Sequence, residues 1–321
     1  MRLKHAFQVF IDNFATTYKL LIYRLIVTAL VVGLGCAVVI PSINVVVHTT
    51  QYADVSDAFA AFWDSVTKLD FSTLSTQFET LKSSLSALRD LLVEEAWLIA
   101  VDVICMAIVL LIYMFLLAVG EYVTGELIKH KMTLRADTSF TITLLKNLKR
   151  ACLYAVIYAP ISFLYYAVSA TFIWALVFVG LGFASPLIKL FLTAVLLIVL
   201  FSVKFTFMTD WLPSMLHAKM SNRKSIAYAL QLKNKAPAGT MSSAIVMAVL
   251  VLAINISVPL FTFGAGLLLT IPAGAMIFTS YQFINYYDNN GLKYFIDEYT
   301  IVGPKKDAPI SREEFFKGDD K

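Results

Sequence analysis

The stretch AWLIAVDVICMAIVLLIYMFLLAV, residues 96–119, decides the fold class of this chain. It contains one charged side chain, Asp102, and nearly all its other residues are apolar. A helix that crosses the hydrocarbon core of a bilayer needs about 20 predominantly apolar residues. The stretch therefore predicts a membrane-spanning helix.

The composition of the whole chain agrees with this prediction. Of its 321 residues, 59% are apolar and 15% are charged, whereas soluble domains are about half apolar and a quarter charged. We therefore predict an all-α, polytopic integral membrane protein whose first apolar run is an uncleaved span. Its six transmembrane helices are expected at about residues 22–46, 96–119, 152–180, 187–208, 241–262 and 265–284.

The distribution of charge predicts the orientation in the membrane. Basic residues outnumber acidic ones in the lead-in (1–21) and in the loops 120–151 and 209–240, whereas residues 48–95 contain three basic and eight acidic residues. Short loops rich in Lys and Arg stay in the cytoplasm. We therefore expect a cell-membrane protein with both termini, including the tail 285–321, in the cytoplasm and residues 47–95 outside.

The exterior segment 47–95 carries two apolar stripes with helical spacing. A shorter stripe precedes residues 68–70, and Asp70 is placed to cap the helix that follows. One interpretation is an extracytoplasmic helical hairpin whose stripes bury each other. The other is a docking surface for a protein partner or a second copy, because the second stripe is longer than the first. The longer stripe comprises Phe71, Leu74, Phe78, Leu81, Leu85, Leu88 and Leu92; the shorter comprises Val55, Phe59, Phe62 and Val66.

Two amphipathic segments are expected on the cytoplasmic side. In the lead-in, Leu3, Phe7, Phe10 and Phe14 share one helical face, which is typical of a helix lying in the lipid interface. The segment 221–235 is basic, and its cations are expected to contact anionic lipid headgroups. Nucleic acid is a poor alternative because no aromatic residues alternate with the basic ones. The expected headgroup contacts are Arg223, Lys224, Lys233 and Lys235.

One passage resembles a known pattern. FTFMTDWLPSMLHAKMSNRKSIAYALQLKNK, residues 205–235, is followed by two spans joined by a Gly-rich turn. This arrangement over about residues 200–285 resembles bacterial multi-span proteins of unknown function. They are related to the membrane domain that precedes some glycerophosphodiester phosphodiesterases. The resemblance implies an architecture and no activity, because nothing here resembles the catalytic domain of those enzymes.

Polar residues within the spans are the main functional candidates, since ionisable groups in a bilayer are costly. The ionisable candidates lie toward the two surfaces: Asp102 and Lys189 toward the exterior, and Glu121 and Lys204 toward the cytoplasm. Lys204 is interpreted mainly as a snorkelling lysine with Glu121 as a possible partner, and Trp211 as part of the aromatic belt. The alternative is a polar cavity between proline-kinked spans. The candidate residues are Asp102, Glu121, Lys189, Lys204 and Asn255.

No pattern in the sequence indicates catalysis. HExxH and GxSxG motifs are absent, and the four histidines are scattered over separate segments, so no catalytic residue, metal site or cofactor is expected. Two functions remain. The first is a non-catalytic scaffold, sensor or accessory subunit that binds a partner through the hairpin. The alternative is a small transporter or lipid-handling permease.

Overall fold

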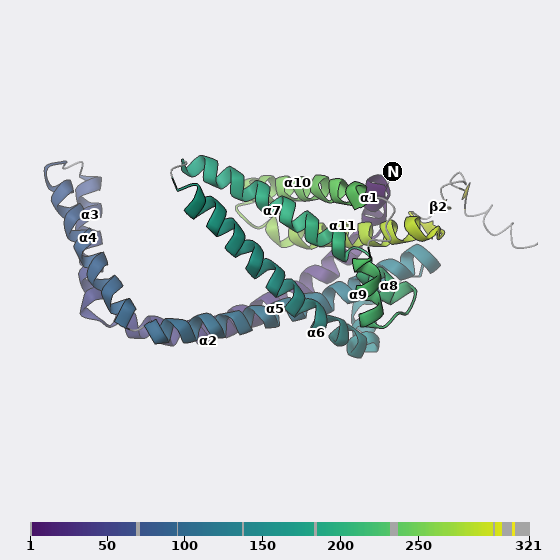
Figure 1. The fold of residues 1–321 in the computed structure, drawn as a ribbon, viewed down its shortest axis with the longest axis horizontal. Coiled ribbons are helices and arrows are strands. Elements are labelled where there is room, and N and C mark those ends of the chain that lie inside the picture. The colour runs from purple at the N-terminus through teal and green to yellow at the C-terminus, as the bar shows by residue number, and fades with distance from the viewer. Residues whose placement is uncertain are drawn as a thin grey trace, which may run out of the picture. The chain divides into compact units, whose positions relative to one another are not determined.

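The computed structural model describes residues 2–68, 71–94, 96–136, 138–182, 185–231, 237–297, 299–303 and 310–311. Helices dominate it (Figure 1). The chain divides into two compact units, Met1–Val27 with Met114–Lys321, and Thr28–Tyr113. We call these the large unit and the hairpin unit.

Six helical segments are long and apolar enough to cross a membrane, which confirms the predicted all-α polytopic fold. Most are longer than predicted, because helical structure continues past the apolar run into polar residues. α6 continues into a π-helical turn, Trp174–Gly180, and α7 is followed closely by α8, Trp211–His217. The six helices are α2 (Phe14–Val47), α5 (Ala96–Leu134), α6 (Phe140–Ile173), α7 (Pro186–Met208), α10 (Pro237–Phe261) and α11 (Leu267–Asn290).

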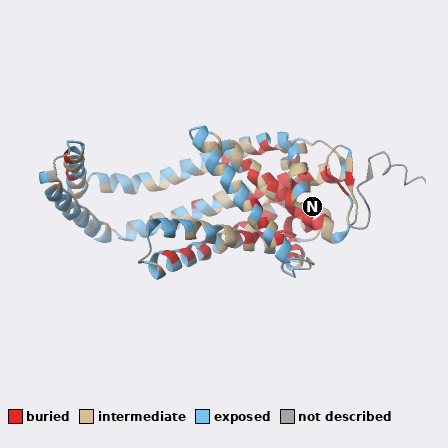
Figure 2. Ribbon diagram, turned by 90° about the horizontal axis from the view of Figure 1, so that it is seen from above, coloured by how far each residue is buried: buried red, intermediate tan, exposed pale blue. Residues whose placement is uncertain are grey.

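The core of the large unit is built around the C-terminal half of α11. Residues 279–287 of this helix are all buried, polar and apolar alike. Elsewhere the spanning helices expose many large apolar side chains, such as Leu187 and Phe191 of α7 at 78% and 72%. The buried residues accordingly gather at one end of this unit (Figure 2). The C-terminal half of α11 is therefore enclosed by protein, while the outer helices present apolar surface of the kind that faces lipid.

The lead-in helix α1, Arg2–Asp12, packs on α11. Ala6 and Val9 are fully buried, and Leu3, Phe7 and Phe10 pack against the same core. The apolar face predicted from the sequence is real, but its partner is protein. The packing on α11 leaves Leu3, Phe7 and Phe10 half-buried, and the location of α1 in the lipid interface stays a prediction.

The chain after α11 forms a small sheet. α11 ends at Gly291, whose φ of 64° places it in the left-handed region that terminates helices. The strands β1 (Tyr294–Phe295), β2 (Thr300–Val302) and β3 (Ile310–Ser311) then form a small antiparallel sheet in the order β1-β2-β3. Tyr294, Phe295, Ile296 and Ile301 are buried parts of the large unit.

Glycine allows the last two spans to approach closely. A Cβ added at Gly274 of α11 would lie 2.8 Å from Cγ1 of Val251 on α10. The turn between these helices contains Gly264 at a φ of +88°, which disfavours any other residue. The Gly-rich hairpin expected from the sequence is therefore a close helix–helix contact.

In the hairpin unit, α3 (Thr50–Thr67) packs on α4 (Phe71–Glu94). Phe62 and Phe78 meet with ring centroids 6.2 Å apart. Leu74, Leu81, Leu88 and Leu92 are half-buried, whereas Phe78 and Leu85 remain 53% and 49% exposed. The predicted stripe is thus only partly covered. Asp70, the predicted cap, and the side chain of Phe71 lie outside the described residues.

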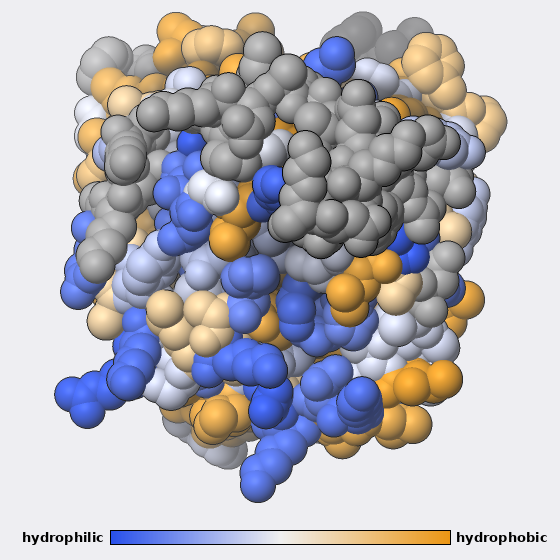
Figure 3. Space-filling view, turned by 90° about the vertical axis from the view of Figure 1, so that its right-hand side faces the viewer, coloured by the Kyte–Doolittle hydropathy of each residue, from blue (hydrophilic) through white to orange (hydrophobic). Residues whose placement is uncertain are grey.

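The end of the large unit that carries α8 and α9 (Asn222–Leu230) presents many hydrophilic side chains (Figure 3). Arg223 and Lys224 on α9 are exposed, as a role in headgroup contact requires. Lys233 and Lys235 lie outside the described residues.

Candidate functional site

A cavity of about 370 Å³ lies within the large unit. Each of the six spanning helices contributes to its lining. The lining residues are Leu20 and Arg24 of α2; Met114, Leu117, Ala118, Glu121 and Thr124 of α5; Tyr158, Ser162 and Tyr166 of α6; Phe201, Lys204, Phe205 and Met208 of α7; Val251 and Asn255 of α10; and Ile271, Gly274, Ala275, Phe278, Thr279 and Gln282 of α11.

Helical spacing explains how each element presents its residues to this cavity. On α6, Tyr158, Ser162 and Tyr166 recur every four residues, so they form a ladder along one face. On α7, Phe201 and Lys204 are three residues apart, and similar spacings of three and four run along α5 and α11. Each helix therefore lines the cavity with one stripe of side chains, and the rest of its surface is available to lipid or neighbouring helices.

Lys204 is the most unusual residue of the lining. It is only 6% exposed, and its ammonium lies 5.1 Å from the ring centroid of Tyr158 and 4.1 Å from that of Tyr166. In the described part of the chain this ammonium has no hydrogen-bond acceptor or carboxylate at bonding distance. The snorkelling interpretation is therefore wrong, because the side chain is held inside the helix bundle against two aromatic faces.

Glu121 and Arg24 are the other charged residues of the lining. Glu121, predicted as a partner for Lys204, lines the same cavity and interacts electrostatically with both Lys204 and Arg24. Arg24 also approaches the carbonyl of Ile271 on α11 at 3.5 Å. The charged lining thus consists of two cations and one anion.

Two amide side chains add polar groups with unused bonding capacity. Asn255, a predicted site residue, and Gln282, which is 7% exposed, both line the cavity. Among the described residues, neither Oδ1 of Asn255 nor Oε1 of Gln282 has a hydrogen-bond partner. Buried amides are normally satisfied, so these two groups are free to bond a molecule in the cavity.

The remaining predicted site residues lie elsewhere. The ammonium of Lys189 donates to the carbonyl of Gly182 at 3.0 Å and so connects α7 to the loop before it. Asp102 is a half-buried residue of the hairpin unit and does not line the cavity. The structure therefore brings together Glu121, Lys204 and Asn255 from the predicted set.

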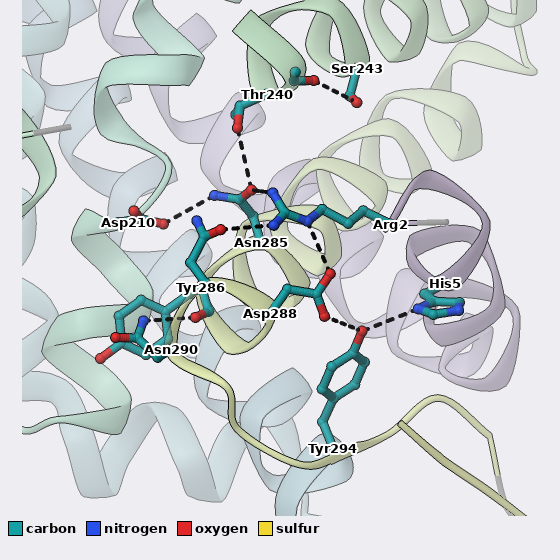
Figure 4. Close-up of polar contacts among 12 residues, drawn as sticks. Arg2, His5, Asp210, Thr240, Ser243, Asn285, Tyr286, Asp288, Asn290 and Tyr294 are labelled. Atoms are coloured by element: carbon teal, nitrogen blue, oxygen red, sulfur yellow. Dashed lines mark hydrogen bonds and ion pairs between the residues drawn. The ribbon is translucent and has the colours of Figure 1, made fainter. Parts of the chain in front are cut away.

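A polar network joins α1, α8, α10 and α11 at the end of the large unit (Figure 4). The guanidinium of Arg2 donates from Nε to Asp288 at 3.0 Å, from Nη1 to Asn285 at 2.6 Å and from Nη2 to Asn289 at 2.8 Å. Nδ2 of Asn285 donates to Asp210, which precedes α8, at 3.3 Å. These three partners are spaced i, i+3 and i+4, so Arg2 holds α1 against a single face of α11.

The network continues from Asp288 toward the sheet. The hydroxyl of Tyr294 donates to Oδ1 of Asp288 at 2.9 Å, so it accepts a hydrogen bond from Nδ1 of His5 at 3.1 Å. Burial lowers the pKa of His5 below 6.5 and raises the pKa of Tyr294 well above 10. Tyr294 therefore keeps its proton near pH 7, as its donation to Asp288 requires.

The network comes within three residues of the cavity lining at two points along the chain. Gln282 lines the cavity, and Asn285 follows it by three residues; Met208 lines the cavity, and Asp210 follows it by two. Trp211 is 2% exposed and packs on Tyr154 and Tyr158 with centroid distances of 5.5 Å. The expectation that Trp211 lies in the aromatic belt is therefore wrong, because it is part of the packed end of the cavity.

Several site residues were missed by sequence reasoning. The spacing of Tyr158, Ser162 and Tyr166 within an apolar run was a visible signal of a polar helical face. Gln282 and Arg24 also stood within or beside the spans. Arg2 and Asn285 carried no such signal, because their pairing joins residues 283 positions apart.

Within the described ranges, no group of three or more His, Cys, Asp or Glu residues is placed to hold a metal ion. No family model matches the chain, and neither the comparison with curated proteins nor that with solved structures yields a match. The resemblance to the membrane domain of phosphodiesterases stays a prediction.

Proposed function

We propose that this multi-span protein is a small transporter or lipid-handling permease, without catalytic activity, that binds an amphipathic molecule between its spans. The observation that carries the proposal is the cavity with Lys204 inside it. The cavity volume falls in the range of about 300–1,000 Å³ that is common for small-molecule sites. An ionisable side chain buried within a membrane-spanning helix is by default a candidate for a substrate or ion path.

The location of the protein follows from its charge distribution. The basic loops favour a cell-membrane protein with both termini in the cytoplasm. The exposed hydrophilic end of the large unit, with Arg223 and Lys224, would then face the cytoplasm.

Filling the cavity tests this function. The full chain is purified in mild detergent, bound molecules are extracted with organic solvent, and they are identified by mass spectrometry. Ala275→Phe places a ring in the cavity, whereas Ala170→Phe adds the same ring at an exposed position of α6. We expect one class of amphiphile to accompany the wild type and Ala170→Phe, and to be lost from Ala275→Phe. Equal amounts in both variants, with normal thermal unfolding of Ala275→Phe, would contradict the proposal.

A second candidate rests on the hairpin unit. Phe59 and Trp63 of α3, and Phe78 and Leu85 of α4, are 49–58% exposed. Exposed aromatic and aliphatic residues on an otherwise polar hairpin favour a scaffold, sensor or accessory subunit that docks a protein partner or second copy. That role uses the hairpin unit and does not require the cavity, whereas the transporter role requires the cavity of the large unit.

A further inference from the structure

We propose that the cavity selects single-chain amphiphiles with an anionic phosphate or carboxylate group, and that Lys204 is the residue that binds this group. The inference rests on the proposed function and adds the chemical class of the ligand.

The charge of the lining carries the first step. Arg24 and Lys204 are cationic, Glu121 is anionic, and among the described residues no other Asp, Glu, Lys or Arg lines the cavity. The described lining therefore carries a net positive charge in a region enclosed by apolar helices. An anion on a bound molecule would balance this charge, whereas a cationic molecule would increase the imbalance.

The position of Lys204 carries the second step. Its ammonium has aromatic faces on two sides, from Tyr158 and Tyr166, but no acceptor among the described residues. The aromatic faces offset only part of the cost of removing an ammonium from water. A phosphate or carboxylate would supply the charge-assisted hydrogen bonds that the ammonium lacks.

The rest of the lining indicates the remainder of the ligand. Most lining residues are apolar, such as Met114, Phe201 and Phe278, so a small hydrophilic anion would leave most of the cavity surface without contact. An acyl chain would cover that surface. The free carbonyl oxygens of Asn255 and Gln282 suit hydroxyl donors close to a headgroup.

Four probes with the same fluorescent acyl chain test the selectivity. They carry a phosphate monoester, a carboxylate, a zwitterionic phosphocholine or an uncharged glycerol headgroup. Their affinities are measured on the full chain in phosphatidylcholine nanodiscs. We expect the two anionic probes to bind roughly tenfold to a hundredfold more tightly than the uncharged one, the effect of one charge-assisted contact.

Variants assign this preference to Lys204. Lys204→Met should abolish the difference between anionic and uncharged probes, and Lys204→Arg should retain most of it. Glu121→Gln removes the competing anion and should raise the affinity for anionic probes alone. The matched control is Lys189→Met, because Lys189 does not line the cavity and its ammonium donates to the carbonyl of Gly182.

Two results would overturn the assignment. One is equal affinity of the wild type for anionic and uncharged probes. The other is a Lys204→Met variant that discriminates as well as Lys189→Met. Either result leaves the cavity as a binding site for amphiphiles and removes only the headgroup preference. A wild type that binds no probe saturably would instead contradict the proposed function itself.

Discussion

At the scale of single residues, Asn285 connects more elements than any predicted site residue. Its Oδ1 accepts hydrogen bonds from Arg2 at 2.6 Å and from Thr240 at 3.3 Å, and its Nδ2 donates to Asp210. Asn285 is fully buried. One amide therefore joins the lead-in helix, the fifth span and the segment after the fourth span to α11.

Asn285→Ala should lower the free energy of unfolding of the large unit. The change leaves Arg2 and Asp210 without one partner each, and an unsatisfied buried polar group costs about 1–3 kcal/mol. Thermal or denaturant unfolding in detergent, followed by circular dichroism, measures the loss. Asn44→Ala is the control because Asn44 is exposed on α2. Equal stability of the two variants would mean that the network contributes little to folding.

The residue scale also shows what the sequence could predict about the site. Hydropathy and the count of residues from a span end predict where Lys204 lies along its helix, because that depends only on position in one element. The direction of the side chain depends on which neighbours surround α7, and that requires the packing of all six spans. For this reason Lys204 was expected to snorkel, whereas it is directed inward against Tyr158 and Tyr166.

At the scale of elements, the contact between α10 and α11 depends on a small residue at one point. Gly274→Val should destabilise this pair, because even its Cβ would lie 2.8 Å from Cγ1 of Val251. Overpacking of this kind costs about 1–3 kcal/mol. The midpoint of thermal unfolding in detergent measures it.

The same substitution elsewhere provides the control. Gly33→Val introduces an identical side chain into α2, where a Cβ would meet nothing within 4 Å. We expect the unfolding midpoint to fall in Gly274→Val alone. A similar fall in both variants would indicate an effect of valine on the helices themselves.

Elements that are defined by the spacing of apolar residues along a single helix could be predicted well from the sequence. The six apolar helices and the two helices of the exterior segment follow from runs and repeats that one helix carries alone. The apolar face of α1 was also visible, but the sequence could not say whether lipid or protein covers it. The strands β1 and β2 were missed because each is only two or three residues long and is stabilised by pairing across a turn.

At the scale of the whole molecule, the division into two units separates the two candidate functions. All lining residues of the cavity belong to the large unit, and the exposed aromatic residues of the second candidate belong to the hairpin unit. Loss of the hairpin should therefore leave the cavity intact.

Replacing residues 50–94 with a short flexible linker should leave the bound amphiphile in place. Mass spectrometry of the extracted ligand measures this, and the wild type purified in parallel sets the reference amount. Proteins captured from native membranes by the two forms are compared in the same preparations. A variant that keeps the ligand supports the cavity as the functional site. The hairpin unit would instead be favoured as the functional site if the variant loses the ligand and if a protein is captured by the wild type alone.

The packing of Trp211 has a spectroscopic consequence. Of the four tryptophans, Trp211 alone is buried, whereas Trp63, Trp97 and Trp174 are 58–66% exposed. It contacts Tyr158, and Tyr158 lines the cavity. A molecule that displaces the Tyr158 ring would therefore change the surroundings of the Trp211 indole. In a chain that retains only this tryptophan, intrinsic fluorescence would report occupancy of the cavity without any label.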